Sequence, residues 1–140
     1  MKSPALFMFA VSCVVMPLPA AAQDFISGVH ATSRELCDKA REQPDGLQTL
    51  FEEGNVVLTH RGIEGIEYNC EFLQVLPATR SPGFVVTALC QEPGYAYPET
   101  LVIMQSAEGE LELTSSMDVG EDEESGNSGT YYLCEGVEMP

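Results

Sequence analysis

Apolar residues along this chain come in short runs or alternate with polar ones, and the runs are separated by glycine, proline and polar turns. Runs rich in β-branched and aromatic residues are typical of strands. Near-regular spacing with short turns predicts a mainly-β protein, an antiparallel meander curled into a small open barrel or a sandwich. The expected strands are residues 56–60, 66–76, 84–90, 100–105, 110–114 and 130–134.

One short helix is expected before the strands, over residues 33–43. Leu36, Cys37 and Ala40 recur at spacings of three and four, which is the pattern of an amphipathic helix. Thr32 or Ser33 can cap its start, and the Pro-Asp-Gly sequence that follows is expected to end it.

Two other segments give a weaker signal. Residues 47–53 carry leucine and phenylalanine at helical spacing, but the stretch is short and stays ambiguous. Residues 23–31 are expected to form a short, loosely structured lead into the domain.

The central feature is a predicted hairpin of residues 66–76 and 84–90, with Cys70 and Cys90 placed symmetrically about position 80. Facing residues of antiparallel strands have Cα atoms about 4.5–5.5 Å apart, which is within disulfide reach. Alternation along the first strand places Phe72 and Leu76 on the same face as Cys70.

The pairing of the cysteines stays open at this point. The hairpin favours Cys70–Cys90, which leaves Cys37–Cys134; the alternative joins Cys37 to Cys70 and Cys90 to Cys134. Of the five cysteines, Cys13 lies in an expected export signal, residues 1–22, and four remain after it. An even number of cysteines in an exported chain indicates disulfides in an oxidising compartment. No pair has C-x-x-C spacing, so neither a metal site nor a redox pair is predicted, and no cofactor is expected.

Residues 1–22 have the pattern of a secretory signal peptide. Met1 and Lys2 give a positive start, an apolar run follows, and Ala20-Ala21-Ala22 provides the small residues of a cleavage site. The apolar run is shorter than the roughly 20 residues that span a bilayer. Cleavage after Ala22 is expected, with a lipoprotein cut before Cys13 as the alternative. The mature chain would then be one secreted or periplasmic domain, residues 23–140.

The chain is strongly acidic, with six basic and 22 acidic residues and a net charge of −16. Loss of Lys2 leaves five basic residues against 22 acidic ones, or −17. Such a charge repels nucleic acid and anionic lipid. We therefore expect no nucleic-acid partner and no membrane insertion after signal cleavage. A basic protein is the expected kind of partner, and the oligomeric state is left open.

No catalytic set is apparent, so a non-enzymatic protein is predicted. The two histidines, His30 and His60, have no free cysteine to activate, because the mature cysteines are expected to be bridged. Glu110 and Glu112 alternate with leucine, which indicates a solvated strand face. A carboxylate-based hydrolase remains an alternative, with Glu64 and Glu67 or Glu110 and Glu112 as possible pairs. It requires two carboxylates to converge in a cleft.

The candidate binding residues lie in two loops. Tyr95 and Tyr97 are expected in a proline-bounded loop, where aromatic residues make good contact anchors. Residues 118–129 are expected to form a flexible acidic loop, in which Asp118 and Glu121 could attract cations. Its spacing does not match an EF-hand, so no specific metal site is predicted.

Two resemblances add to this interpretation. The segments 62–70, 90–94 and 131–134 contain Gly-x-Glu-x-x-Cys, a Cys followed by Glu and Gly, and Tyr-x-x-Cys, and they resemble uncharacterised families of small exported disulfide-containing bacterial proteins. That resemblance covers about residues 32–135 and implies an envelope location. The Ser-Gly-x-x-Tyr stretch at Ser128, Gly129 and Tyr132 is similar to periplasmic lysozyme inhibitors, which are small disulfide-bonded β-barrels.

The function expected from these observations is a non-enzymatic secreted or periplasmic binding domain, with a basic protein as the expected partner. The alternative is a structural or stress-related envelope protein with no small-molecule site. An exposed apolar patch would favour the binding domain.

Overall fold

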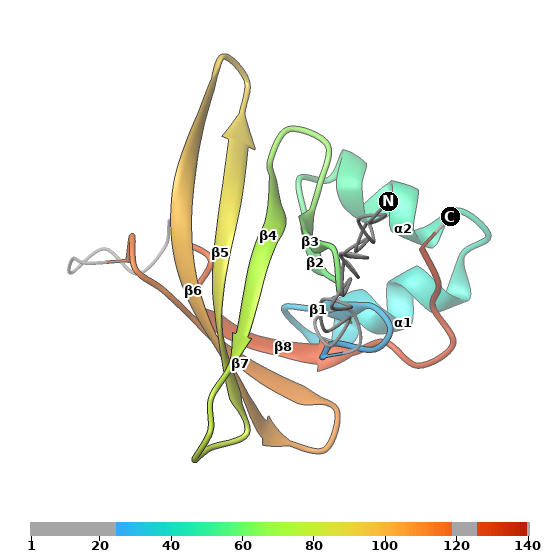
Figure 1. Ribbon diagram of the computed structural model, residues 1–140. Coiled ribbons are helices and arrows are strands. Elements are labelled where there is room, and N and C mark those ends of the chain that lie inside the picture. Colours follow the sequence, from blue (N-terminus) through green and yellow to red (C-terminus); the bar gives the residue numbers. More distant parts are fainter. Residues whose placement is uncertain (1–24, 119–125, 140) are drawn as a thin grey trace, which may run out of the picture.

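The computed structural model describes residues 25–118 and 126–139, and in this part of the chain eight antiparallel strands close into a barrel beside two short helices (Figure 1). The prediction of a mainly-β meander with a helix near its N-terminus is confirmed, and the barrel is closed. The elements are β1 (His30–Ala31), α1 (Arg34–Glu42), α2 (Gly46–Glu52), β2 (Val57–Leu58), β3 (Gly62–Glu64), β4 (Asn69–Pro77), β5 (Gly83–Glu92), β6 (Tyr95–Ala107), β7 (Glu110–Ser115) and β8 (Gly129–Leu133).

The barrel closes because β1 pairs with both β2 and β8. His30 faces Leu58 on one side and Leu133 on the other. Neither β1 nor β3 was predicted, since β1 lies in the expected loose lead and β3 in an expected turn. In these two strands the two or three residues carry too little pattern to detect, and neighbouring strands determine their conformation.

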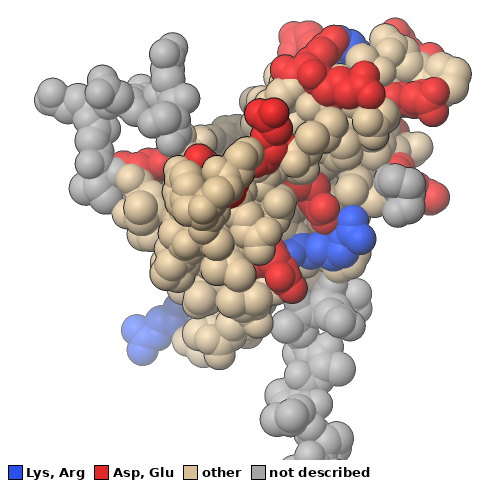
Figure 2. All heavy atoms as spheres, turned by 90° about the horizontal axis from the view of Figure 1, so that it is seen from above, with Lys and Arg blue, Asp and Glu red and all other residues tan. Residues whose placement is uncertain are grey.

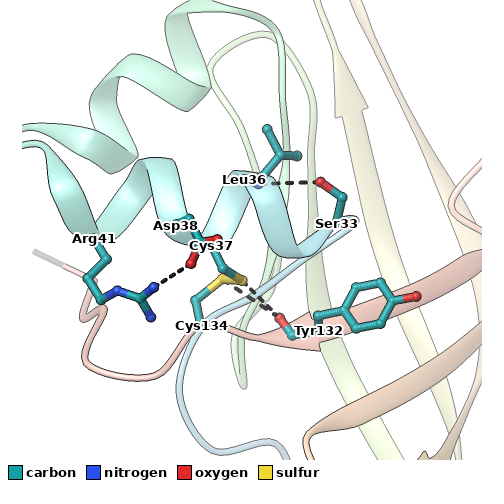
Figure 3. Close-up of polar contacts among 7 residues, drawn as sticks. All are labelled: Ser33, Leu36, Cys37, Asp38, Arg41, Tyr132 and Cys134. Atoms are coloured by element: carbon teal, nitrogen blue, oxygen red, sulfur yellow. Dashed lines mark hydrogen bonds and ion pairs between the residues drawn. A yellow bond between two sulfur atoms is a disulfide. The ribbon is translucent and has the colours of Figure 1, made fainter.

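The central hairpin pairs β4 with β5 and places Cys70 directly opposite Cys90. A disulfide joins these two cysteines. The second disulfide joins Cys37 in α1 to Cys134, which directly follows β8 (Figure 3). The pairing favoured by the hairpin geometry is therefore the one found. Two disulfides fit a protein of an oxidising compartment.

A β-bulge in β4 corrects the expected facing of side chains. The register shifts between Phe72 and Gln74, so that Leu73 is the extra residue. Beyond it, Val75 packs against the barrel core and Leu76 is exposed. The simple alternation expected from the sequence holds only as far as Phe72.

Two apolar clusters stabilise the fold. The first fills the barrel and includes Leu58, Ile63, Val86, Leu101 and Ile103. The second lies between the helices and the outer side of β1, β2 and β8. Its fully buried members are Ala31, Leu50 and Val57. The β strands nearest the helices are thus covered on both faces.

The helices follow local sequence signals. Ser33 caps α1 by accepting a hydrogen bond from the Leu36 amide at 3.3 Å (Figure 3). The ambiguous segment after the Pro-Asp-Gly turn is a second helix, α2. Its start packs tightly against α1, because a Cβ atom on Gly46 would lie 2.2 Å from the Ala40 carbonyl oxygen.

The lead segment is more ordered than expected. Ile26 and Val29 are buried, and Phe25 packs on the rings of Phe72 and Phe84 with centroids 6.0 and 4.9 Å away. Phe84 lies near the start of β5, whereas Cys90 lies near its end. Phe25 therefore packs toward the end of the barrel away from the Cys70–Cys90 disulfide.

The expected signal peptide (residues 1–22), Cys13 and Glu121 lie outside the described residues. Within the ranges that are described, neither helix has the length and apolar character needed to cross a membrane.

Candidate functional site

A pocket of ≈480 Å³ opens at the end of the barrel where the β5–β6 turn and the β3–β4 connection lie. Figure 2 looks onto this end from above and shows separate patches of acidic atoms, most of them toward the upper right, and fewer patches of basic atoms. The lining residues come from β5, β6, β8 and the connections beside them. They are Thr32, Val56, Glu67, Tyr68, Glu92, Pro93, Tyr97, Glu99, Met117, Asp118, Gly126, Asn127, Ser128 and Tyr131.

The most buried acidic residue of the pocket lining is Glu99, of which only 4% is exposed. Its carboxylate accepts hydrogen bonds from the Ser115 hydroxyl and from Asn127 Nδ2, the latter at 3.2 and 3.0 Å to the two oxygens. The four ion pairs of the described residues involve other acidic side chains. Glu99 is therefore a buried carboxyl group with no cationic partner in that part of the chain.

The backbone of β6 explains why Glu99 points inward. Leu101 and Ile103 are fully buried in the barrel core, and Glu99 continues the same alternating face. Near the barrel mouth this face meets polar groups instead of apolar ones. Burial of a carboxylate costs several kcal/mol when no opposite charge is nearby, and two hydrogen bonds offset only a part of this cost.

Asn127 connects the groups around Glu99. Besides its bonds to the carboxylate, it donates to the Tyr68 hydroxyl, and its backbone carbonyl accepts from the Tyr131 hydroxyl at 3.3 Å. The neighbouring Ser128 hydroxyl accepts from the Ser115 amide at 2.8 Å, and the Ser128 amide donates to Asp118 at 2.9 Å. These contacts hold Asn127 and Ser128 in fixed positions, so the expected surface loop does not include Asn127, which is buried.

Three tyrosines of the pocket have raised pKa values, mainly because they are buried. Burial, followed by the charges of Glu99 and Asp118, raises the pKa of Tyr131 to about 12. Burial is also the largest cause that raises the pKa of Tyr68 and of Tyr97, and the negative charge of Glu99 contributes to both. These hydroxyl groups keep their protons at neutral pH. Because acidic side chains and no lysine or arginine line the pocket, it disfavours anions and favours cations.

The Cys70–Cys90 disulfide forms part of the surroundings of Glu99. Cys90 Sγ lies 3.0 Å from Glu99 Oε2, and the Tyr68 hydroxyl lies 3.0 Å from Cys70 Sγ. The two sulfurs and a Glu99 oxygen lie within 4.8 Å of one another. Metal binding requires thiolates, however, and both sulfurs are in the disulfide.

A second pocket of ≈450 Å³ adjoins the first. It lies between the end of α2 and the β3–β4 connection, and it shares Val56, Glu67 and Tyr68 with the first pocket. Its other lining residues are Phe51, Glu52, Glu53, Gly54, Asn55, Gly65 and Ile66. Neither lining set contains a lysine or an arginine.

The structure brings together some of the predicted site residues and separates others. Tyr97, Asp118 and Ser128 line the first pocket. Tyr95 does not line it but stacks on Tyr97, with ring centroids 5.8 Å apart. The expected loop around these two tyrosines is wrong, because β6 starts at Tyr95 and pairs with β5 from Tyr95 to Met104.

Tyr132 lies on a different side of the barrel from the pocket. It packs with the cluster beneath α1, and the Arg34 guanidinium stacks over its ring at 4.7 Å. The sulfurs of Cys37 and Cys134 lie 3.4 and 3.7 Å from its carbonyl oxygen (Figure 3). Ser128 and Tyr132, which carry the similarity to lysozyme inhibitors, therefore do not share one site.

Among the pocket residues that the sequence analysis missed are Tyr68, Glu99, Asn127 and Tyr131. A signal for Glu99 was present, since an acidic residue continues the apolar face of Leu101 and Ile103. The other three carried no comparable signal. Asn127 looks like a loop residue, and tyrosine is common on either face of a strand.

The other predicted acidic positions lie mostly at the surface. Glu112 is exposed, and Glu110 forms an ion pair with Arg34. Glu67 is exposed but lines both pockets. Carboxylates of Glu67, Glu92, Glu99 and Asp118 thus converge on one pocket, which is the arrangement required by the hydrolase alternative.

Comparisons with protein-family models, with curated proteins and with solved structures find no match for this chain. The two sequence resemblances remain predictions.

Proposed function

We propose that the protein is a secreted or periplasmic binding protein whose barrel-mouth pocket binds a positively charged group, most simply a primary ammonium. The observation that carries the proposal is Glu99, a buried carboxylate at a pocket whose lining includes no basic residue. A barrel of eight strands has room to hold one small ligand group at its mouth.

The lining of the pocket matches the needs of an ammonium group. Such a group carries three N–H donors and a full positive charge. Glu99 provides the opposite charge, while the hydroxyl oxygens of Tyr68 and Tyr97 and the carboxylate of Glu92 are further acceptors in the same lining. The bound cation would offset the cost of burying the Glu99 carboxylate.

The charge of the whole chain supports the same conclusion. A net charge of −16 attracts cationic ligands over distances of about a Debye length, and the attraction weakens with salt. The proposed location rests on the signal-like pattern of residues 1–22 and on two disulfides, which fit an oxidising compartment.

The test is a calorimetric titration with pentylammonium, and with pentanol as the neutral analogue of similar shape. The Glu99→Gln variant removes the buried charge, and Glu71→Gln is the matched control, because it removes an equal charge from the outer wall of β4. We expect the ammonium and not the alcohol to bind. We also expect Glu99→Gln to weaken binding at least about tenfold, the scale of a hydrogen bond to a charged group, and Glu71→Gln to leave it within about twofold.

Thermal unfolding of each variant shows whether it folds. If Glu99→Gln does not fold, Glu92→Gln replaces it, with a smaller loss of affinity expected because Glu92 is less buried. Equal affinity for the ammonium in the original chain and in the folded Glu99→Gln variant contradicts the proposal, as does the absence of any binding at millimolar ammonium.

A hydrolase is a second candidate, favoured by one observation. Buried Glu99 and exposed Asp118 line the same pocket, and acid–base catalysis uses two carboxylates in different environments. A screen of chromogenic glycosides tests it. Turnover that is lost in Glu99→Gln and kept in Glu71→Gln would favour the hydrolase. Absence of turnover together with ammonium binding favours the binding protein.

A further inference from the structure

The pocket over Glu99 continues into the neighbouring pocket, so the site is longer than a small amine. Val56, Glu67 and Tyr68 line both pockets, so the two pockets, of ≈480 and ≈450 Å³, adjoin each other. A primary amine would occupy the first part only.

The two parts differ in chemistry. The first contains the buried carboxylate and the tyrosine hydroxyls. The second has an apolar wall from Phe51, Val56 and Ile66, and Ile66 is 56% exposed. Glu52 and Glu67 border this wall. A ligand that fills both parts therefore needs a cationic group followed by an apolar one.

We propose that the two pockets together bind a segment of a basic polypeptide, with one lysine side chain in the Glu99 pocket and an apolar side chain near it on Phe51 and Ile66. This inference rests on the proposed function and names the partner class. The argument is charge complementarity, since acidic residues and no basic ones line both pockets. A polyamine has cationic groups but lacks a side chain for the apolar wall.

The hydrogen bonds of Glu99 favour lysine over arginine. Arginine binds a carboxylate best through two parallel N–H···O bonds, which need both oxygens to be accessible. Here Asn127 approaches both oxygens and Ser115 donates to one of them. A lysine ammonium is a compact charge, and it can bind through a single hydrogen bond to one lone pair of a Glu99 oxygen.

The experiment compares short capped peptides with pentylammonium by calorimetry. Each peptide holds one lysine and one leucine in an alanine background, with the leucine one, two or three positions from the lysine on either side. Companion peptides carry norleucine or arginine for lysine, or serine for leucine. We expect the best lysine–leucine peptide to bind at least tenfold more tightly than pentylammonium, and each companion to bind more weakly.

Two protein variants locate the peptide. Ile66→Ala removes the exposed apolar side chain of the second pocket, and Leu76→Ala removes a side chain that is 51% exposed on the outer wall of β4. We expect Ile66→Ala to weaken the peptide about three- to tenfold and to leave pentylammonium unchanged. Leu76→Ala should change neither.

The outcomes separate this inference from the proposed function. If pentylammonium binds through Glu99 but no peptide binds more tightly, or Ile66→Ala has no effect on the peptide, the polypeptide partner is excluded and the ammonium site remains. If neither probe binds, both proposals fail. An arginine peptide as tight as the lysine peptide overturns the choice of lysine.

Discussion

At the scale of residues, the unusual feature of this protein is the small set of polar side chains inside it. Within residues 25–118 and 126–139 they are His30, Thr59, Glu99, Ser115 and Asn127. Two of these, Ser115 and Asn127, donate hydrogen bonds to a third, Glu99, beside the pocket. Glu99 could have been noticed in the sequence, because it falls on the apolar face of its strand. The burial of Asn127 could not, because it depends on contacts with Tyr68, which is far away in the chain, and with Tyr131.

His30 lies apart from the pocket and makes stability depend on pH. It is buried, and its Nδ1 atom has no hydrogen-bond partner among the described residues. Burial lowers the pKa of His30 below 6.5. The unfolded chain thus binds a proton at a pH where the folded chain does not. This contribution to stability is present above pH 6.5 and is lost as the pH falls toward the lower pKa of the folded state.

We expect the free energy of unfolding to fall by up to about 1.4 kcal/mol per pH unit as the pH drops below 6.5, the limit for one proton. In His30→Leu this part of the slope should disappear. Urea unfolding at several pH values between 7.5 and 5.5 measures it. His60→Gln is the control, since His60 is exposed. An unchanged slope in His30→Leu would show that other groups cause the pH dependence.

At the scale of elements, the sequence predicted the longer strands and the two-residue strand β2, and it missed β1 and β3. The hairpin of β4 and β5 was found because both strands are rich in apolar residues and are joined by a loop with two prolines and a glycine. The sequence predicts a start of β6 at Thr100, because Pro98 is typical of a loop end. Pairing with β5 starts at Tyr95, after the two-residue turn Pro93–Gly94. No pattern in β4 signalled the bulge at Leu73, which follows from how the strand fits β5.

Gly62 allows β3 to approach β4 closely. It has φ +150°, and a Cβ atom there would lie 1.8 Å from the Cys70 carbonyl oxygen. We expect Gly62→Ala to lower the free energy of unfolding by about 2–5 kcal/mol, from backbone strain together with the clash.

Gly94→Ala is the matched comparison, since Gly94 has φ +97° but no atom lies within 4 Å of the point that a Cβ atom would occupy. This substitution should cost only the backbone strain, about 1–2 kcal/mol. Urea unfolding of the two variants compares them. Equal losses would show that the approach of β3 to β4 relaxes easily.

At the scale of the molecule, closure of the barrel could not be predicted from the sequence. An open barrel or a sandwich was expected, because the pattern of the long strands is the same in all three. The difference lies in two-residue β1, which joins β2 to β8. The disulfides were more predictable, because position in a hairpin restricts which cysteines can face each other.

The two disulfides should differ in what they contribute to stability. Cys37–Cys134 spans 97 positions and Cys70–Cys90 spans 20. A longer closed loop restricts the unfolded chain more, by about 1 kcal/mol for this difference. All four cysteines are buried, so the cavities left by alanine should have similar costs.

We therefore expect Cys37→Ala with Cys134→Ala to destabilise the protein more than Cys70→Ala with Cys90→Ala. Urea unfolding of the two double variants tests this expectation. An equal or larger loss for the Cys70–Cys90 pair would mean that its packing beside Glu99 outweighs the effect of loop length.

The pairing of β1 with β8 closes the barrel, and until it forms, a newly made chain has unpaired strand edges that can aggregate. Synthesis starts at the N-terminus, so His30 and Ala31 emerge long before Gly129–Leu133, their partners on one side. Until then the barrel is open between β1 and the position of β8, and the unpaired backbone groups at this opening can pair with another chain. The nascent protein therefore remains prone to aggregation until the five residues of β8 have been made and have paired with β1.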